Sequence, residues 1–505
     1  MTMLQRRTLD ALRATRTDPV DADTLDAAGA IVSEVRAGGD AALRAWAEKL
    51  GDRAPGEPLV LGADAMAAAL ASLPEGDRDL LRRTAERIRT FAMAQRAALG
   101  TPEVPIPGGV AGLRYAPVDR AGCYAPGGRF PLPSSVLMTV MTARAAGVRE
   151  VWVASPRPTA VTLAAAAIAG ADRVLAVGGA QAIAALAYGT ESVAPCAAIV
   201  GPGSRWVTAA KQHVAGHVAI DMLAGPSELV VLADGSADPD LVAADLLAQA
   251  EHDPDAVPIL ITDSEALAEA VGEHIARQLA DLPTAETARA ALENGGVVVV
   301  EDMAAGRAAC DDLAPEHLAL HGASAEAAAP SFRHYGALFI GEGAAEVLGD
   351  YGAGPNHVLP TGGNARSFGA LSVTSFLRVQ NWMRIDNIAG ARELALDAAR
   401  LGRLEGLEGH ARSADRRVAA AAAAAAQVPP ADEHALRLEG LQQGLAEGLA
   451  RARERMLRML EVKYGELMEV YQTQVLDASE EQLDHWSERV LAAVGVEGIF
   501  GEDEE

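Results

Sequence analysis

The spacing of apolar positions changes along the chain. Residues 21–48 and 75–98 carry apolar side chains at helical spacing between segments rich in proline and glycine, which predicts two helices of a terminal cap or arm. From about Gly122, short apolar runs alternate with alanine-rich helical stretches. The runs are residues 151–153, 173–177, 198–200, 229–232, 257–262, 296–300 and 336–340. This alternation predicts parallel βαβ units, with enough strands for two doubly wound sheets.

The pattern becomes helical again in the last third of the chain. Residues 372–417 are expected to be helical and are followed by an eight-alanine run over 419–426. The pair Pro429 and Pro430 then marks a boundary, because proline restricts both its own backbone and that of the residue before it. We therefore predict an α/β fold of two Rossmann-like parallel-sheet domains, with small helical terminal arms and an additional helical tail.

Composition and charge limit the class of protein. The 505 residues are 50% apolar and can bury a large core, while 69 acidic against 43 basic residues give a net charge of −26. This charge argues against nucleic-acid and anionic-membrane partners. The start lacks the apolar stretch of a signal peptide, and no run of about 18 apolar residues could span a bilayer. We expect a cytoplasmic protein.

The three cysteines exclude some chemistry. Cys123, Cys196 and Cys310 are isolated in the sequence, without the Cys-x-x-Cys spacing of thiolate zinc sites and without a disulfide pattern. Any metal site must therefore use nitrogen and oxygen ligands.

Glycine-rich turns follow several predicted strands. Gly178-Gly179, Gly201-Pro202-Gly203 and Gly225-Pro226 lie where an α/β sheet presents backbone amides to a phosphate. Neither Gly178-Gly179 nor Gly201-Pro202-Gly203 completes the spaced glycine fingerprint of dinucleotide-binding loops. Dinucleotide binding and ordinary tight turns are therefore both open interpretations.

Acidic, amide and imidazole side chains recur at several places. Gln249 and His252 end a predicted helix at a spacing of three, which puts both on one face, and Glu316 and His317 follow a proline. His317 titrates near neutral pH without help, and a neighbouring carboxylate can handle a second proton. The alternative interpretations are solvated surface residues for the first pair and a helix start for the second.

Two more segments carry candidate ligands. The glycine-rich stretch 349–357 contains Asp350 and reads as a loop, and residues 405–410 contain Glu405 and His410. Taken together, one Asp, two His and one Gln form an N/O ligand set that suits zinc.

At this point the sequence resembles the histidinol dehydrogenase family, from about residue 20 to about residue 417. The segments that carry the resemblance are CYAPGG, VGGAQAIAALAYGTESV, GPG, IDMLAGPSE, LAQAEHDPD, APEHL, GDYGAGPNHVLPT and LEGLEGH. The resemblance implies oxidation of L-histidinol through L-histidinaldehyde to L-histidine with two NAD, the last step of histidine biosynthesis. It also implies a homodimer with intertwined arms.

The resemblance also assigns site residues. One zinc ion per subunit would be held by Gln249, His252, Asp350 and His410, with His410 from the partner subunit, and the proton acceptors would be Glu316 and His317. The implied substrate contacts are Ser227, Gln249, His252, His317, Asp350, Glu405 and His410. The implied NAD contacts are Tyr124, Gln181 and Ser204. Ser204 departs from the asparagine usual in the family and offers fewer hydrogen-bonding groups.

The expected domain division follows from the same resemblance. It runs as follows: an N-terminal arm over 1–19, a first α/β domain over 20–122 and 228–368, a second Rossmann-like domain over 123–227, a dimerisation arm over 369–418, an Ala/Pro linker over 419–430 and a helical tail over 431–505. The tail lies outside the family and resembles the C-terminal region of Rpn-family transposases, without a nuclease core. We interpret it as an interaction or oligomerisation appendage with an unidentified partner.

Two competing functions follow from the same residues. A paralogous zinc- and NAD-dependent dehydrogenase would act on another amino or sulfonated alcohol, because a fold does not fix a substrate. Glu405 and His410, which the family uses around histidinol, argue against it. A non-catalytic scaffold would act through its tail, and the complete set of candidate site residues argues against that.

Overall fold

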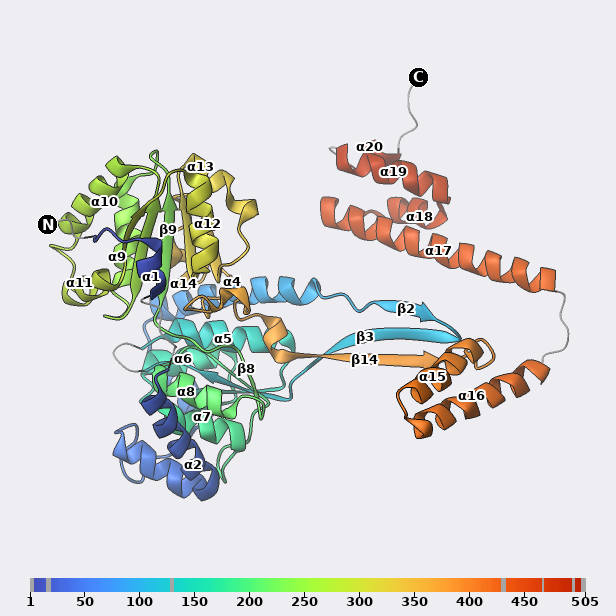
Figure 1. Cartoon of the computed structure of the whole chain (residues 1–505), viewed down its shortest axis with the longest axis horizontal. Helices are drawn as coiled ribbons and strands as arrows, with labels where there is room; N and C mark the ends of the chain where they lie inside the picture. Colours follow the sequence, from blue (N-terminus) through green and yellow to red (C-terminus); the bar gives the residue numbers. More distant parts are fainter. Residues whose placement is uncertain are drawn as a thin grey trace. The chain divides into compact units, whose positions relative to one another are not determined.

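The computed structural model describes residues 4–14, 20–127, 131–427, 433–465, 467–492 and 496–500 (Figure 1). The predicted boundary at Pro429 and Pro430 and the acidic end of the chain lie outside these residues. The chain divides into two compact units, residues 1–103 with 112–382, and residues 104–111 with 383–505.

The first sheet of the larger unit has six strands in the order β1-β6-β5-β4-β7-β8. The strands are β1 (Val60–Leu61), β4 (Arg120–Tyr124), β5 (Glu150–Ala154), β6 (Arg173–Leu175), β7 (Ala198–Val200) and β8 (Ala219–Ile220). All pair in parallel except β1, which runs antiparallel to β6. Counted from β4, the order is 3-2-1-4-5, so the direction of winding reverses between β4 and β7, as in a Rossmann sheet.

Helices cover both faces of this sheet. Their bounds are α2 (Ala22–Lys49), α3 (Ala63–Ser72), α4 (Glu75–Ala97), α5 (Pro133–Ala146), α6 (Ala160–Ala169), α7 (Gly179–Tyr188) and α8 (Arg205–Val214). Apolar side chains of α3, α4, α5 and α6 form one buried cluster, and those of α2, α7 and α8 form another. The two predicted N-terminal helices are therefore part of the layers around this sheet.

The structure differs here from the expected domain division. Residues 20–122 were grouped with 228–368, but they supply β1 and most of β4 to the first sheet. The physical reason is that the apolar faces of α2 and α4 are buried on this sheet's helices, where Leu43 and Ile88 are almost fully enclosed.

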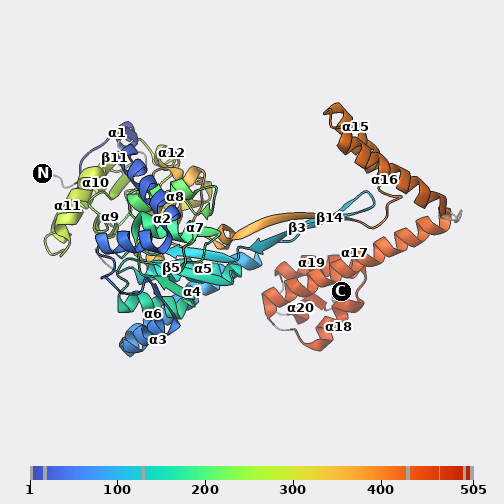
Figure 2. The ribbon, with the colours of Figure 1, turned by 90° about the horizontal axis from the view of Figure 1, so that it is seen from below.

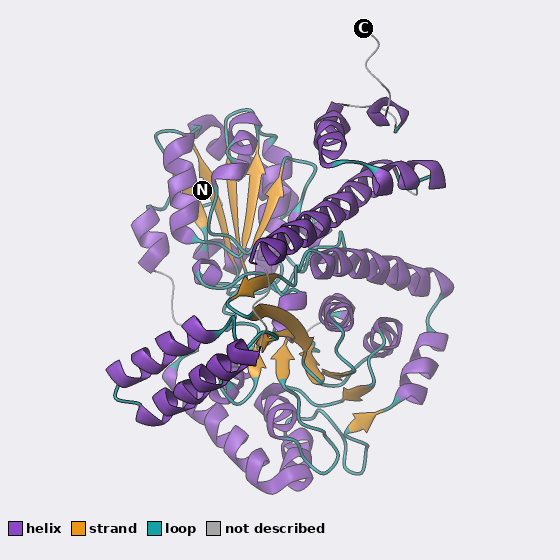
Figure 3. Ribbon diagram, turned by 90° about the vertical axis from the view of Figure 1, so that its right-hand side faces the viewer, coloured by secondary structure: helices purple, strands orange, loops and turns teal. Residues whose placement is uncertain are grey.

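The second sheet has five parallel strands in the order β11-β10-β9-β12-β13, and in Figure 3 its strands run between helices. The strands are β9 (Glu228–Ala233), β10 (Val257–Thr262), β11 (Gly296–Val299), β12 (His317–His321) and β13 (Ala337–Ile340). One face is covered by α9 (Pro239–Ala250), α10 (Glu265–Gln278) and α11 (Ala285–Asn294). The other is covered by α1 (Leu9–Ala14), α12 (Met303–Leu313) and α13 (Ala323–Ala327). The predicted α/β class with parallel sheets is confirmed.

A third, three-stranded sheet has the order β14-β3-β2. It contains β2 (Glu103–Ile106), β3 (Gly109–Pro117) and β14 (Leu377–Ile385), so the prediction of continuous helix after Ser372 is wrong for β14. Glycines on β3 allow its close pairing: a Cβ at Gly109 would lie 1.9 Å from the carbonyl oxygen of Arg384. Sequence patterns do not show this pairing, because it joins segments far apart in the chain.

The smaller unit is helical beyond β14. Its helices are α15 (Arg392–Leu404), α16 (Glu408–Gln427), α17 (Glu433–Tyr464), α18 (Glu469–Asp477), α19 (Glu480–Ala492) and α20 (Glu497–Phe500), and Figure 2 shows α17, α19 and α20 in red. Met456, Leu460, Leu483 and Val490 form a small core of the tail. None of the described helices combines the length and apolarity needed to cross a bilayer.

Candidate active site and cofactor pocket

The candidate acid–base residues lie at the amino ends of two neighbouring strands. His317 is the first residue of β12, and Ser227 immediately precedes β9. The strands pair in parallel with His317 opposite Leu229, which brings Ser227, Glu316 and His317 together. The alternative interpretation of the Glu316-His317 pair as a helix start is wrong, because the apolar run that follows is a buried strand.

Glu316 is held by two donors. The Ser227 hydroxyl donates to Glu316 Oε2 at 2.7 Å, and the Glu228 amide donates to the same oxygen at 2.9 Å. Burial raises the pKa of the Glu316 carboxyl well above its ordinary value, and the two hydrogen bonds oppose that rise because they favour the carboxylate. The result is a carboxylate oriented for proton transfer and more basic than an exposed one.

His317 presents one free nitrogen. Its Nδ1 donates to the Glu228 carbonyl oxygen at 3.1 Å, which leaves Nε2 as the unprotonated nitrogen of the neutral ring. The side chain is buried, and Nε2 has no hydrogen-bond partner in the structure. Burial lowers the pKa of His317 to about 4, so the ring is neutral at pH 7 and Nε2 can accept a proton.

Beside this pair lies a group of metal-ligating side chains. His252, Glu346 and Asp350 each offer a ligand atom, and these atoms lie within 4.8 Å of one another. His317 Nε2 is 3.9 Å from Asp350 Oδ1, so the two groups form one site. Glu346 and Asp350 lie on the short helix α14 (Glu346–Asp350).

Gln249 completes the group from α9. It is fully buried, and with its amide nitrogen turned towards Glu346 it donates to Glu346 Oε1 at 2.9 Å, while its amide oxygen lies 3.0 Å from the Ser227 hydroxyl oxygen. His252 lies beyond the end of α9 at Ala250, so the predicted placement of both residues on one helix face is wrong. A turn links them instead, in which the His252 amide donates to the Gln249 carbonyl at 3.3 Å.

The charges of this group fit a cation. The strongest charges acting on buried Glu346 are those of Asp350, Glu316 and Asp245, and burial together with these like charges raises its pKa well above the ordinary value. Nitrogen and oxygen donors around such negative charge are the ligand types that zinc takes when no thiolate is present. The residues present therefore fit a bound divalent metal.

Two further residues of the site were not among the predicted ones. Glu346 is four residues before Asp350, a spacing that places both on one face of a helix. His357 donates from Nδ1 to the Asp350 carbonyl at 2.9 Å, and its Nε2 lies 3.4 Å from the Ser135 hydroxyl on α5. The four-residue spacing between Glu346 and Asp350 is a sequence signal for Glu346, but it is informative only in a helix. The prediction of a loop around Asp350 therefore hides it.

Glu405 and His410 belong to the smaller unit. Glu405 caps the C-terminal end of α15, His410 lies in α16, and both are exposed.

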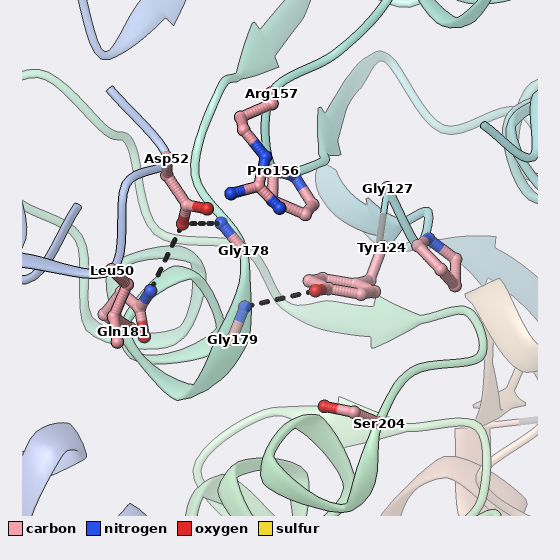
Figure 4. Close-up of a pocket in the computed structure, with 11 residues that line it drawn as sticks. Leu50, Asp52, Tyr124, Gly127, Pro156, Arg157, Gly178, Gly179, Gln181 and Ser204 are labelled. Atoms are coloured by element: carbon pink, nitrogen blue, oxygen red, sulfur yellow. Dashed lines mark hydrogen bonds between the residues drawn. The ribbon is translucent and has the colours of Figure 1, made fainter. Parts of the chain in front are cut away.

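A separate pocket lies at the carboxyl ends of the first sheet's strands. It has a volume of about 250 Å³, and Figure 4 shows its lining. Its lining comes from the segments that follow β4, β5, β6 and β7, together with the end of α2: Leu50, Asp52, Tyr124, Pro126, Gly127, Pro156, Arg157, Gly178, Gly179, Gln181 and Ser204. The pocket thus lies at the switch point, where Rossmann sheets bind dinucleotides.

Tyr124, Gln181 and Ser204 all line this pocket. The Gly179 amide donates to the Tyr124 hydroxyl at 3.1 Å, and buried Gln181 has a side-chain oxygen without a hydrogen-bond partner. Ser204 is the exposed N-cap of α8 and makes no capping hydrogen bond with its side chain. Polar side chains therefore line a space of the right kind for a nucleotide.

The first sheet carries a pocket at its switch point, and the second sheet carries a histidine–carboxylate site. Together they define the class of protein as a dinucleotide-dependent oxidoreductase. The chain belongs to the histidinol dehydrogenase family, whose model matches residues 14–418.

Individual relatives agree with that family. The chain is 49% identical to the histidinol dehydrogenase of Thermus thermophilus over 388 residues, which cover 77% of this chain and 93% of the relative. It is 47% identical to that of Halobacterium salinarum, over 79% of this chain and 94% of the relative. The crystal structure of histidinol dehydrogenase from Elizabethkingia anophelis superposes with a TM-score of 0.78 at 29% identity, covering 83% of this chain and 99% of that one.

Proposed function

We propose that the chain oxidises L-histidinol through L-histidinaldehyde to L-histidine with two molecules of NAD, as the final step of histidine biosynthesis. The observation that carries the proposal is the unpartnered Nε2 of buried His317, beside Glu316 and the metal-ligating group. The relatives named histidinol dehydrogenase support the substrate. We further propose a cytoplasmic homodimer, in which residues 369–418 form the dimerisation arm.

The metal-ligating group would hold one zinc ion per subunit through Gln249, His252, Asp350 and the partner subunit's His410. A bound zinc ion supplies a template for the amino group and imidazole of the substrate, and secondarily a Lewis acid. Glu346 contacts Gln249 and shares its helix with Asp350, which suits a residue that orients the ligands. Ser227 would contact the substrate beside Glu316, and Glu405 would do so in the partner's site.

His317 would act in the first oxidation. Its neutral ring accepts the proton of the alcohol at Nε2 as the carbinol hydrogen leaves as hydride for NAD. The Glu228 carbonyl keeps the other nitrogen protonated, so only Nε2 is basic. This hydrogen bond also fixes the orientation of the ring.

Glu316 would act in the second oxidation. The carboxylate takes a proton from water, the resulting hydroxide adds to the aldehyde, and the hydrate loses a second hydride to fresh NAD. The Ser227 hydroxyl and the Glu228 amide hold the carboxylate on a single oxygen. The other oxygen, Oε1, is then available to bind the attacking water.

Glu316→Gln separates these two roles. The variant keeps a side chain of similar shape but loses the base, so the oxidation of L-histidinaldehyde is expected to slow about a hundredfold or more, within the usual range for acid–base groups. The oxidation of L-histidinol to the aldehyde is expected to fall much less. Rapid-quench measurements with each substrate, together with zinc content, provide the test, and equal losses in both steps would contradict the assignment.

A further inference from the structure

The cofactor pocket contains a charged residue to which no role has been assigned. Arg157 lines it, three residues beyond Ala154, the last residue of β5. β5 is the second strand of the Rossmann order in the first sheet, and the end of this strand is where such sheets meet the adenosine ribose. An acidic residue usually receives the ribose 2′-hydroxyl there, whereas arginine accommodates a phosphate.

The backbone of Arg157 is strained. Its φ is +44°, in the left-handed region that glycine adopts freely and other residues avoid. A non-glycine residue in this region is strained, and such strain is concentrated at ligand sites. Figure 4 shows the guanidinium beside Asp52 and Pro156, above Gly178. The strained backbone thus carries a cation that faces the pocket.

Asp52 explains why a cation is needed there. Asp52 is 8% exposed, and its carboxylate accepts hydrogen bonds from the Gly178 amide at 2.9 Å and from Gln181 Nε2 at 3.4 Å. Burial raises the pKa of Asp52, while the Gly178 hydrogen bond and the charge of Arg157 oppose the rise. A carboxylate at this place repels an anionic ligand, and Arg157 is the one basic side chain among the described residues that line the pocket.

Gln181 provides independent support for a ligand in the same pocket. Its side chain is 1% exposed, and its Oε1 has no hydrogen-bond partner in the structure, while its Nε2 is fixed by Asp52. A buried acceptor without a donor is costly unless a ligand supplies one. A ribose hydroxyl next to a phosphate offers that donor.

We propose that Arg157 binds a phosphate group at the adenosine end of the dinucleotide, with Asp52 as the positioning residue of Gln181 beside it. The proposal rests on the proposed use of NAD in this pocket. The phosphate is either part of the pyrophosphate or a 2′-phosphate, and both share the chemistry that arginine recognises.

The test uses the full chain and isothermal titration with three probes: adenosine, ADP and adenosine 2′,5′-bisphosphate. Arg157→Ala is expected to weaken ADP or the bisphosphate about tenfold at low salt and to leave adenosine unchanged, because only the phosphate contact is lost. Loss with ADP identifies the pyrophosphate, and loss with the bisphosphate alone identifies the 2′-phosphate. Arg157→Lys is expected to restore part of the affinity.

Two controls keep the result interpretable. Arg157→Gly removes the same guanidinium and relieves the strained φ, so it must show the same loss with no decrease in melting temperature. Arg173→Ala removes an exposed arginine at the opposite end of the same sheet and is expected to change nothing. Unchanged affinities of the Arg157 variants for both phosphorylated probes would overturn the inference alone. A wild-type chain that binds neither probe nor NADH would overturn the proposed cofactor pocket as well.

Discussion

His317→Ala is expected to lower kcat for L-histidinol about a thousandfold while the protein retains its zinc. The loss follows from the removal of Nε2, the buried nitrogen with no partner beside Asp350, and lies within the range measured for acid–base groups. Zinc is retained because His317 is not among the proposed ligands. Steady-state kinetics and metal analysis of the same preparation measure both quantities.

The His317→Asn variant tests whether the His317 side chain acts as a base or only supports the structure. Its amide nitrogen can replace Nδ1 as the donor to the Glu228 carbonyl but provides no basic nitrogen. We expect the asparagine variant to fold like the wild type and to be as inactive as the alanine variant. Recovery of most activity by asparagine would contradict the role of His317 as the proton acceptor.

Asp350→Ala is the second change with a large expected effect. It removes a proposed zinc ligand and one of the ligand atoms that lie within 4.8 Å of one another. We expect the variant to bind less than a tenth of the zinc of the wild type and to lose activity about a thousandfold, because the substrate template is lost. Metal analysis after gel filtration and activity at saturating L-histidinol provide the measurements.

Without metal, the Asp350→Ala variant is expected to be at least as stable as the wild type. Asp350 is one of the charges that raise the pKa values of Glu346 and Glu316, so its removal relieves repulsion among buried carboxylates. The melting temperature of the chelated variant is expected to equal or exceed that of the chelated wild type. Glu273→Ala, an exposed carboxylate on α10, serves as the matched control. Normal zinc content in Asp350→Ala would contradict the assignment.

The alternation of apolar runs and helical stretches predicted most of the two parallel sheets. It missed β12, because the run that begins at His317 contains two histidines and follows Pro315 and Glu316. It also missed β14, whose partner β3 lies more than two hundred residues earlier in the chain. The spacing of apolar residues and the local composition indicate whether a segment prefers helix or strand. Strand pairing, in contrast, depends on segments that meet only in the folded chain.

The residues of the candidate site also differ in how well the sequence predicts them. Glu316, His317, Gln249 and Asp350 lie close together in the structure. Glu346 was not predicted, because its four-residue spacing to Asp350 indicates a shared face only if the segment is helical. The place of residues 20–122 was also not predictable, since β1 has only two residues and so leaves no pattern to detect.

The proposed reaction is a zinc-dependent oxidation in two steps, and its most direct test is the amount of NADH formed per L-histidinol consumed. The purified chain is measured with zinc, after chelation, and after zinc is restored. We expect two NADH per substrate, loss of turnover on chelation and its recovery with zinc. One NADH per substrate with release of the aldehyde would contradict it, and so would turnover that survives chelation. No turnover at all would direct attention to another amino alcohol or to the helical tail.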